Sequence, residues 1–239
     1  RRPIFSINVP TINYQIMTNQ KAYFFDMDGV LFDSMPHHAV AWEEVMKAHN
    51  LSFTARDCYI NEGRTGESII REAMLKERHR EATPDEINLI YGEKSARFHV
   101  LADQVGGTVV IEGVADVLRY VQSQGHQIWV VTGSGMRTLI NNLNTALPPV
   151  FQPDRMVTAF DVTKGKPDPE PYLIAWERSG LPKEQCVVIE NAPLGIRSGK
   201  AAGLTVYAVN TGILTREDLA QADQVFDSMA ELLSFLQGQ

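Results

Sequence analysis

The sequence predicts an α/β fold, a doubly wound parallel sheet with an inserted all-helical segment. After residue 105, short apolar stretches alternate with stretches of helical period, which is typical of a parallel sheet covered on both faces. Residues 35–104 contain three helical stretches and no convincing strand. We therefore expect an α/β core domain formed by residues 21–34 and 105–239, and a helical cap domain formed by residues 35–104.

The composition limits the possible partners. The chain has 239 residues, enough to bury a sizeable core, and 44% of them are hydrophobic. A net charge of −7 argues against nucleic acid and anionic membranes, which bind clustered Lys and Arg. No apolar run approaches the roughly 18 residues of a membrane span. The two cysteines, of which Cys186 opens an apolar run, fit a cytoplasmic protein, and a monomer is the working expectation.

The first residues show no clear pattern. Residues 1–16 have no period, and Met17 follows them directly, so we expect residues 1–20 to be an extension outside the fold. This stretch also lacks the continuous apolar core and the small-residue cleavage site of a signal peptide.

The strands and helices follow from the apolar pattern. The first strand is AYFF, residues 22–25, and the stretch 113–125 is a helix that stops at Gly125, a favourable residue after a helix end. The other predicted strands are QIWVV (127–131), RMVTAF (155–160), CVVI (186–189), TVYAV (205–209) and DQVF (223–226). The other predicted helices are 37–49, 67–79, 83–102, 169–180 and 193–203, and the third begins with a capping box, Thr83 to Glu86.

Two carboxylates end the first strand. Asp26 and Asp28 are separated only by Met27, and two like charges about 4 Å apart repel by about 4 kcal/mol at an effective dielectric near 20. We therefore expect a positive group beside them.

The carboxyl ends of parallel strands meet at one edge of a sheet, where ligands bind. Polar residues follow the next three strands at this edge: Thr132, Gly133, Ser134, Lys166, Glu190 and Asn191. Carboxylate and amide oxygens suit Mg²⁺, which keeps waters and binds substrate phosphate. Mg²⁺ and Lys166 would supply the positive charge. Each residue alone also fits a helix cap or an exposed loop, and only their coincidence at successive strand ends favours a site.

Four segments, DMDGV, VVTGS, KGKPDPEPY and VIENAPLGI, resemble the four ordered motifs of the haloacid dehalogenase superfamily. The helical insertion and the HxxAW segment at His38 to Trp42 are similar to its β-phosphoglucomutase-like subgroup with an α-helical cap. The resemblance covers residues 21–239. It implies a Rossmann-like core sheet in the order 5-4-1-2-3 and catalysis through an aspartyl phosphate.

The resemblance also implies a catalytic pair. Asp26 would attack phosphorus, aided by Mg²⁺ on its carboxylate, and Asp28 would act as general acid and base. The backbone carbonyl of Asp28 would also bind the metal. Glu190 and Asn191 would complete the metal site, directly or through water, with Asn191 where the family often has a second acid.

The remaining implied roles concern the phosphoryl group. Thr132 and the amides of Gly133 and Ser134 would hold its oxygens, and Lys166 would offset the negative charge gathered there.

Substrate choice is expected to lie with the cap, through His38 and the loop NEGRTGES, residues 61–68. The loop resembles KGVSRE of the sugar-phosphate mutases, which has a basic residue at Glu62 and, at Gly66, an arginine that binds a distal phosphate. Glu62 is either a cation ligand or a surface acid, and Arg64 either reaches a phosphate or is exposed. The sequence therefore favours a phosphohydrolase acting on a small phosphorylated compound, pyrophosphate included, over a β-phosphoglucomutase.

A non-enzyme alternative is a phospho-accepting receiver module, which also combines an acceptor Asp, a hydroxyl residue and a Lys. Such modules have about half this length and lack a second Asp two positions after the acceptor, so Asp28 argues against them.

Overall fold

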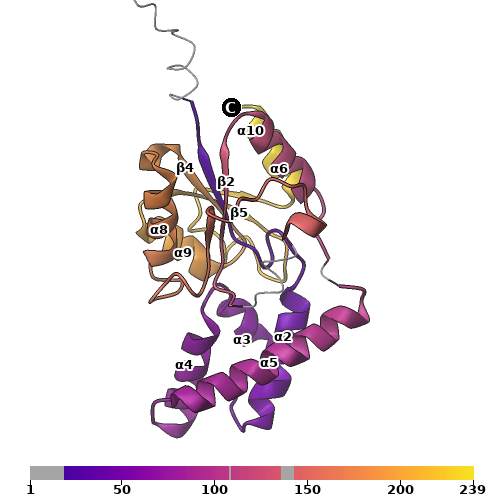
Figure 1. The fold of residues 1–239 in the computed structure, drawn as a ribbon, viewed down its shortest axis with the longest axis vertical. Helices are drawn as coiled ribbons and strands as arrows, with labels where there is room; N and C mark the ends of the chain where they lie inside the picture. Colours follow the sequence, from indigo (N-terminus) through magenta and orange to yellow (C-terminus); the bar gives the residue numbers. More distant parts are fainter. Residues whose placement is uncertain (1–18, 108, 136–142) are drawn as a thin grey trace, which may run out of the picture.

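The computed structural model describes residues 19–107, 109–135 and 143–239, which contain a six-stranded parallel sheet (Figure 1). The order β3-β2-β1-β4-β5-β6 confirms the expected order and places the sixth strand beside β5. The strands are β1 (Ala22–Phe25), β2 (Gln127–Val131), β3 (Met156–Val157), β4 (Cys186–Glu190), β5 (Thr205–Val209) and β6 (Gln224–Phe226). The predicted extension over residues 1–20 lies, apart from residues 19 and 20, outside the described residues.

Helices cover both faces of the sheet, as the sequence predicts. Side chains of β1 alternate between the two cores: Phe25 packs with α6 (Val114–Ser123) and α10 (Met229–Gln237), and Phe24 packs with α8 (Glu170–Ser179) and α9 (Pro193–Ala201). Figure 1 shows these pairs on opposite sides of the strands. Burial on both faces explains why each central strand is an unbroken apolar run.

The third strand is shorter than predicted. Only Met156–Val157 pairs with β2, and the strand predicted over 155–160 is wrong beyond this point. The backbone N–H and the hydroxyl of Thr158 donate to the carboxylate of Asp161, both at 2.9 Å, which turns the chain out of the sheet.

The cap helices are α2 (Met35–Ala48), α3 (Ala55–Ile60), α4 (Gly66–Arg78) and α5 (Pro84–Gln104). They share an apolar core of their own, which includes Trp42, Met46 and Ile70. The predicted capping box at Thr83 is present, and α3, which the sequence did not indicate, begins with a second one at Thr54. The domain boundaries stay a prediction.

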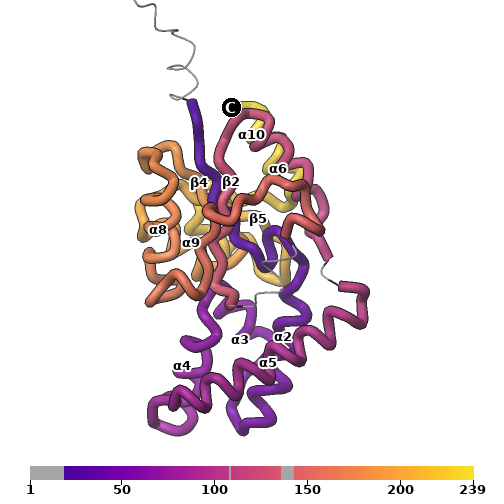
Figure 2. The backbone as a smooth tube through the Cα atoms, in the orientation of Figure 1, coloured from indigo at the N-terminus to yellow at the C-terminus, as the bar shows by residue number. Residues whose placement is uncertain are grey.

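The chain runs between the sheet and the cap helices twice (Figure 2). Backbone hydrogen bonds join the two connecting segments. Asp33 N–H donates to the carbonyl of Val109 at 2.9 Å, and Ile111 N–H donates to the carbonyl of Leu31 at 3.1 Å. Phe32 and Val110 form an antiparallel bridge between them.

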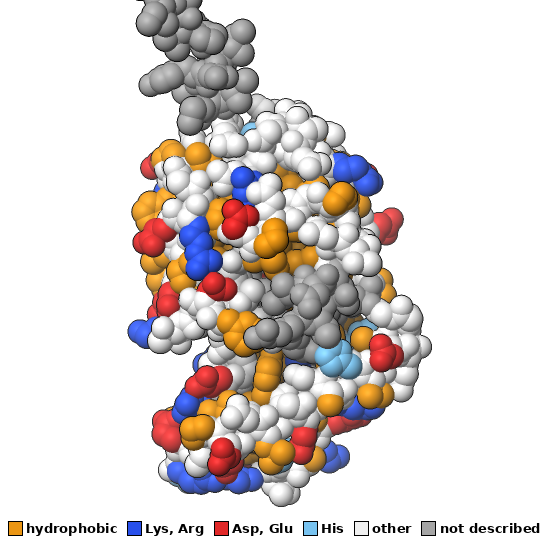
Figure 3. Space-filling view, in the orientation of Figure 1, with side chains coloured by type: hydrophobic (Ala, Val, Ile, Leu, Met, Phe, Trp, Pro, Cys, Tyr) orange, Lys and Arg blue, Asp and Glu red, His pale blue; other side chains and the backbone are white. Residues whose placement is uncertain are grey.

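On the face in Figure 3, Lys and Arg are interspersed with Asp and Glu. None of the helices within the described ranges is long and apolar enough to cross a membrane.

Candidate active site

Three charged residues from different strand ends meet beneath the cap helices. Lys166 Nζ lies 2.7 Å from Asp26 Oδ1 and 2.6 Å from Glu190 Oε1. All three side chains are buried, with exposures of 1–2%. Lys166 is therefore the positive group beside Asp26 in this structure.

Burial sets the protonation of this cluster. It raises the pKa of Asp26 to about 7, and Lys166 opposes the rise. Burial alone would lower the pKa of Lys166, but Asp26 and Glu190 outweigh it, and the pKa is raised. Lys166 is therefore a permanent cation at neutral pH. A further cation beside Asp26 would favour the carboxylate form that a nucleophile needs.

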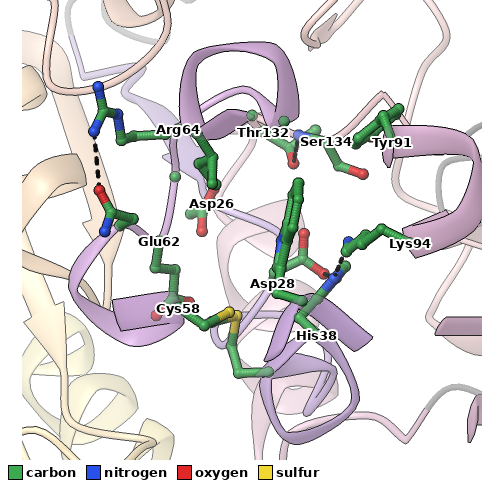
Figure 4. Close-up of a pocket in the computed structure, with 17 residues that line it drawn as sticks. Asp26, Asp28, His38, Cys58, Glu62, Arg64, Tyr91, Lys94, Thr132 and Ser134 are labelled. Atoms are coloured by element: carbon green, nitrogen blue, oxygen red, sulfur yellow. Dashed lines mark hydrogen bonds and ion pairs between the residues drawn. The ribbon is translucent and has the colours of Figure 1, made fainter. Parts of the chain in front are cut away.

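Asp28 faces the cap helices and belongs to a second chain of contacts. Its Oδ1 lies 2.5 Å from Ser34 Oγ and 3.3 Å from His38 Nε2. On the other side of the imidazole, Lys94 Nζ lies 2.6 Å from His38 Nδ1 (Figure 4). Lys94, on α5, is 3% exposed. No local sequence pattern indicates a role for Lys94 or Ser34 at this site.

The geometry fixes the hydrogen positions in this chain. Burial lowers the pKa of His38, and burial lowers the pKa of Lys94 to about 8. At neutral pH a charged Lys94 donates to Nδ1 of a neutral imidazole, so Nε2–H of His38 donates to Asp28. Burial would raise the pKa of Asp28, but His38, Ser34 and Lys94 hold it below its ordinary value. Asp28 is thus a carboxylate with defined donors, as an acid–base group requires.

The cap loop places Glu62 at the strand ends. Glu62 is 6% exposed, and its Oε1 accepts a hydrogen bond from Asn191 Nδ2 at 2.8 Å. Glu62 Oε2 and Asn191 Oδ1 are buried, and neither has a hydrogen-bond partner among the residues that the structure describes. Burial raises the pKa of Glu62 well above its ordinary value, and the nearby Asp26 adds to the rise.

These open oxygens fit a hard divalent cation. No three His, Cys, Asp or Glu side chains in the described ranges form a ready ligand group. Mg²⁺ does not require one, because it binds through one or two carboxylates and keeps waters and substrate phosphate as its other ligands. Asp26, Asn191 Oδ1 and Glu62 Oε2 therefore match its donor preferences.

The predicted phosphate loop lies directly under the cap loop. Ser134 N–H donates to Thr132 Oγ1 at 3.0 Å, and a β-carbon at Gly133 would overlap the backbone of Gly63. The close approach of the two backbones requires glycine at position 133. The cap loop is thus closed over the strand ends in this structure.

A small cavity of about 60 Å³ remains between these groups. Tyr91 of α5 forms part of its wall, and a β-carbon at Gly66 would overlap the Tyr91 ring. The Tyr91 hydroxyl accepts a hydrogen bond from Gly135 N–H at 3.3 Å, which ties the ring to the core. The predicted site residues that line the cavity are Asp26, Asp28, His38, Glu62, Arg64, Thr132, Gly133 and Ser134.

Arg64 pairs within the cap. Its guanidinium donates to Asn61 Oδ1 at 2.9 Å and forms an ion pair with Glu72 of α4. Figure 4 shows the side chain directed away from Asp26. A role for Arg64 in phosphate binding stays a prediction.

Comparison with known protein families identifies the family to which the chain belongs. The model of the haloacid dehalogenase-like hydrolases matches residues 20–203. The chain belongs to this family. It is an enzyme of the family's phosphatase and phosphomutase type, as its relatives are, which excludes the receiver module.

Individual relatives are similar over most of their length. Hexitol phosphatase A of Escherichia coli is 31% identical over 212 residues, 89% of this chain and 93% of the relative. A phosphorylated carbohydrates phosphatase of Thermotoga maritima is 28% identical, over 89% of this chain and its own full length. A solved structure from Bacteroides vulgatus, provisionally described as a β-phosphoglucomutase, has a TM-score of 0.85 and 41% identity, and covers 95% of this chain and 93% of its own.

Proposed function

We propose that this enzyme is a Mg²⁺-dependent phosphohydrolase that acts on a small phosphorylated compound through an aspartyl phosphate, with pyrophosphate as the leading candidate. The observation that carries the proposal is the buried Glu62 carboxylate, which the cap loop holds beside Asn191 with one oxygen unpaired. The cytoplasmic location and the monomeric state remain predictions from composition.

In the first half-reaction, Asp26 attacks phosphorus and the bond to the leaving oxygen breaks. Asp28, a carboxylate in the free enzyme, takes up a proton from solvent when the substrate binds and donates it to that oxygen. In the second, Asp28 takes a proton from water, which attacks the aspartyl phosphate and releases phosphate and Asp26. Lys166, 2.7 Å from Asp26, offsets the negative charge gathered there.

Thr132 and the amides of Gly133 and Ser134 hold the phosphoryl oxygens. The residues that would hold Mg²⁺ are Asp26, the Asp28 carbonyl and Asn191, with Glu190 also predicted there from the sequence. When bound, Mg²⁺ supplies Lewis acidity at the phosphoryl oxygens.

The closed cap loop favours a small substrate, because it leaves a cavity of only about 60 Å³ beside Asp26 and Asp28. A second phosphoryl group that carries its own cation would turn Glu62 from a repelling charge into a ligand. His38 would contact the same group from the Asp28 side.

A β-phosphoglucomutase is the second candidate, favoured by the likeness to the Bacteroides vulgatus structure. The mutases place an arginine at the position of Gly66 to bind a distal phosphate. Here the ring of Tyr91 occupies that space. This contact favours hydrolysis over mutase activity.

Turnover of a substrate panel tests the proposal. The panel contains pyrophosphate, p-nitrophenyl phosphate, hexitol and hexose phosphates and β-glucose 1-phosphate, each measured with and without Mg²⁺. We expect pyrophosphate to give the highest kcat/KM, only with Mg²⁺, and Asp26→Asn to abolish turnover of every substrate. Conversion of β-glucose 1-phosphate without phosphate release would favour the mutase, and Asp26→Asn activity within tenfold of the parent would exclude Asp26 as nucleophile.

A further inference from the structure

The carboxylate of Glu190 is surrounded by hydrogen-bond donors. Its Oε1 accepts from Lys166 Nζ at 2.6 Å and from the Tyr172 hydroxyl at 2.7 Å. Its Oε2 accepts from the backbone N–H groups of Asn191 at 3.0 Å and Ala192 at 3.4 Å. A carboxylate has about four lone-pair sites, and these four donors fill them. A cation bound directly by Glu190 would have to displace a donor.

Tyr172 contacts both members of the Glu190–Lys166 pair. It lies on α8, is 0% exposed, and its ring centroid is 4.9 Å from Lys166 Nζ, within the range of a cation–π interaction. The Tyr172 hydroxyl is the donor of its hydrogen bond with Glu190, because an ionised carboxylate only accepts.

Helix α9 closes the other side of the carboxylate. A β-carbon at Gly195 would overlap Glu190 Oε1, so only glycine allows this close approach. The carboxylate is therefore held between the first turn of α9 and the side chains of Tyr172 and Lys166.

Lys166 in turn uses all its donors. An ammonium group has three protons, and its three acceptors here are Asp26 Oδ1 at 2.7 Å, Glu190 Oε1 at 2.6 Å and the Val131 carbonyl at 3.1 Å. Glu190 supplies a charged acceptor opposite Asp26. The position of Lys166 beside Asp26 therefore depends on where the Glu190 carboxylate points.

We propose that Tyr172 is a positioning residue: its hydroxyl fixes Glu190 as the counter-ion of Lys166, so that Lys166 stays against Asp26 and the divalent cation is left to Asp26, the Asp28 carbonyl and Asn191. This inference rests on the proposed function, in which Asp26 is the nucleophile. It reassigns Glu190 from the predicted metal ligands to the support of Lys166.

Tyr172→Phe removes only the hydroxyl, and hydrolysis of p-nitrophenyl phosphate reports on the Asp26 step whatever the natural substrate is. We expect kcat to fall about tenfold, while KM and the Mg²⁺ affinity of the free enzyme, measured by calorimetry, change less than threefold. The matched control is Tyr120→Phe, whose hydroxyl donates to the Leu236 carbonyl at 3.0 Å on the α6–α10 side of the sheet. It should leave all three quantities unchanged.

Two further variants test the cation ligands directly. We expect Glu190→Gln to change Mg²⁺ affinity less than threefold and Asn191→Ala to weaken it tenfold or more. These measurements need no turnover, so they decide the point even where Tyr172→Phe folds poorly.

Three results would overturn the inference: an unchanged kcat in Tyr172→Phe, an equal loss in Tyr120→Phe, or a loss of Mg²⁺ affinity in Tyr172→Phe or Glu190→Gln as large as in Asn191→Ala. A parent enzyme that hydrolyses no phosphate compound would instead refute the proposed function and the inference with it. If the parent enzyme hydrolyses phosphate compounds and Tyr172→Phe has the same kcat, the inference is refuted but the proposed function is not.

Discussion

The side-chain amide of Asn191, at the end of β4, donates a hydrogen bond of 2.8 Å to the carboxylate of Glu62 in the cap loop. This bond joins the two parts of the enzyme at the point where we expect the substrate's second phosphoryl group. It leaves one oxygen of each side chain without a partner.

Glu62→Ala should therefore lower kcat/KM for pyrophosphate tenfold or more, equivalent to about 1.4 kcal/mol, and leave simple monoesters nearly unchanged. The physical reason is the loss of an acceptor for a cation on the second phosphoryl group. Glu67→Ala, which removes an exposed acid in the first turn of α4, is the matched control. If Glu62→Ala leaves every substrate unchanged, the buried Glu62 has no part in substrate recognition and pyrophosphate loses its support.

Tyr91→Ala should broaden the substrate range, because the Tyr91 ring fills the space next to Gly66 and lines the cavity. We expect the ratio of kcat/KM for hexose phosphates to that for pyrophosphate to rise about tenfold. Tyr91→Phe keeps the ring and should keep the parent ratio. An unchanged ratio in Tyr91→Ala would show that the cap opens far enough to make the ring irrelevant.

Asp28→Ala should slow catalysis by roughly 10²–10⁴-fold, the usual contribution of a general acid–base group. Its predicted metal ligand is a backbone carbonyl, so Mg²⁺ affinity should persist. The loss should shrink for p-nitrophenyl phosphate, whose leaving group needs no proton. Equal losses across poor and good leaving groups would contradict the acid role.

Lys94→Met should change the pH dependence of stability. Burial lowers the pKa of Lys94 to about 8, so below pH 8 the folded enzyme carries the full cost of a buried cation. Between about pH 8 and 10.5 the unfolded chain binds more protons than the folded one, and this cost disappears as the pH rises. Methionine removes the group entirely.

Urea unfolding gives the free energy of unfolding of the variant and of the parent at each pH. The value for Lys94→Met minus the value for the parent should fall by roughly 2 kcal/mol between pH 7 and pH 10, because only the parent is stabilised as the pH rises. Lys47→Met, at an exposed position on α2, should show a constant difference. A pH-independent difference for Lys94→Met would show that its pKa is not lowered.

The sequence predicted the strand-end residues well because polar groups interrupt apolar runs there. Asp26 follows four buried residues of β1, and Glu190 ends the apolar run of β4, so their positions are visible locally. The parallel arrangement then brings the strand ends together.

Residues whose place in the site depends on tertiary packing could not be predicted from the sequence. Lys94 lies in the middle of a helix, where a lysine is normally solvated. It is buried here because it packs against His38, Trp42 and Phe98. Tyr91 meets Gly66 because α4 and α5 cross, and no local pattern encodes that contact. The early end of β3 depends on one side-chain contact, Thr158 to Asp161.

The two connecting segments between sheet and cap helices are joined by the bonds from Asp33 to Val109 and from Ile111 to Leu31. We expect this pair of segments to act as a hinge, because two segments bonded side by side resist sliding and separation but yield to torsion along their common axis. The bridging residue Phe32 also accepts a hydrogen bond from Gly29 N–H at 2.7 Å, immediately after Asp28. We therefore expect the cap to open by a twist that also moves the loop carrying Asp28. The Asp28 side chain would then have its catalytic orientation only when the cap is closed.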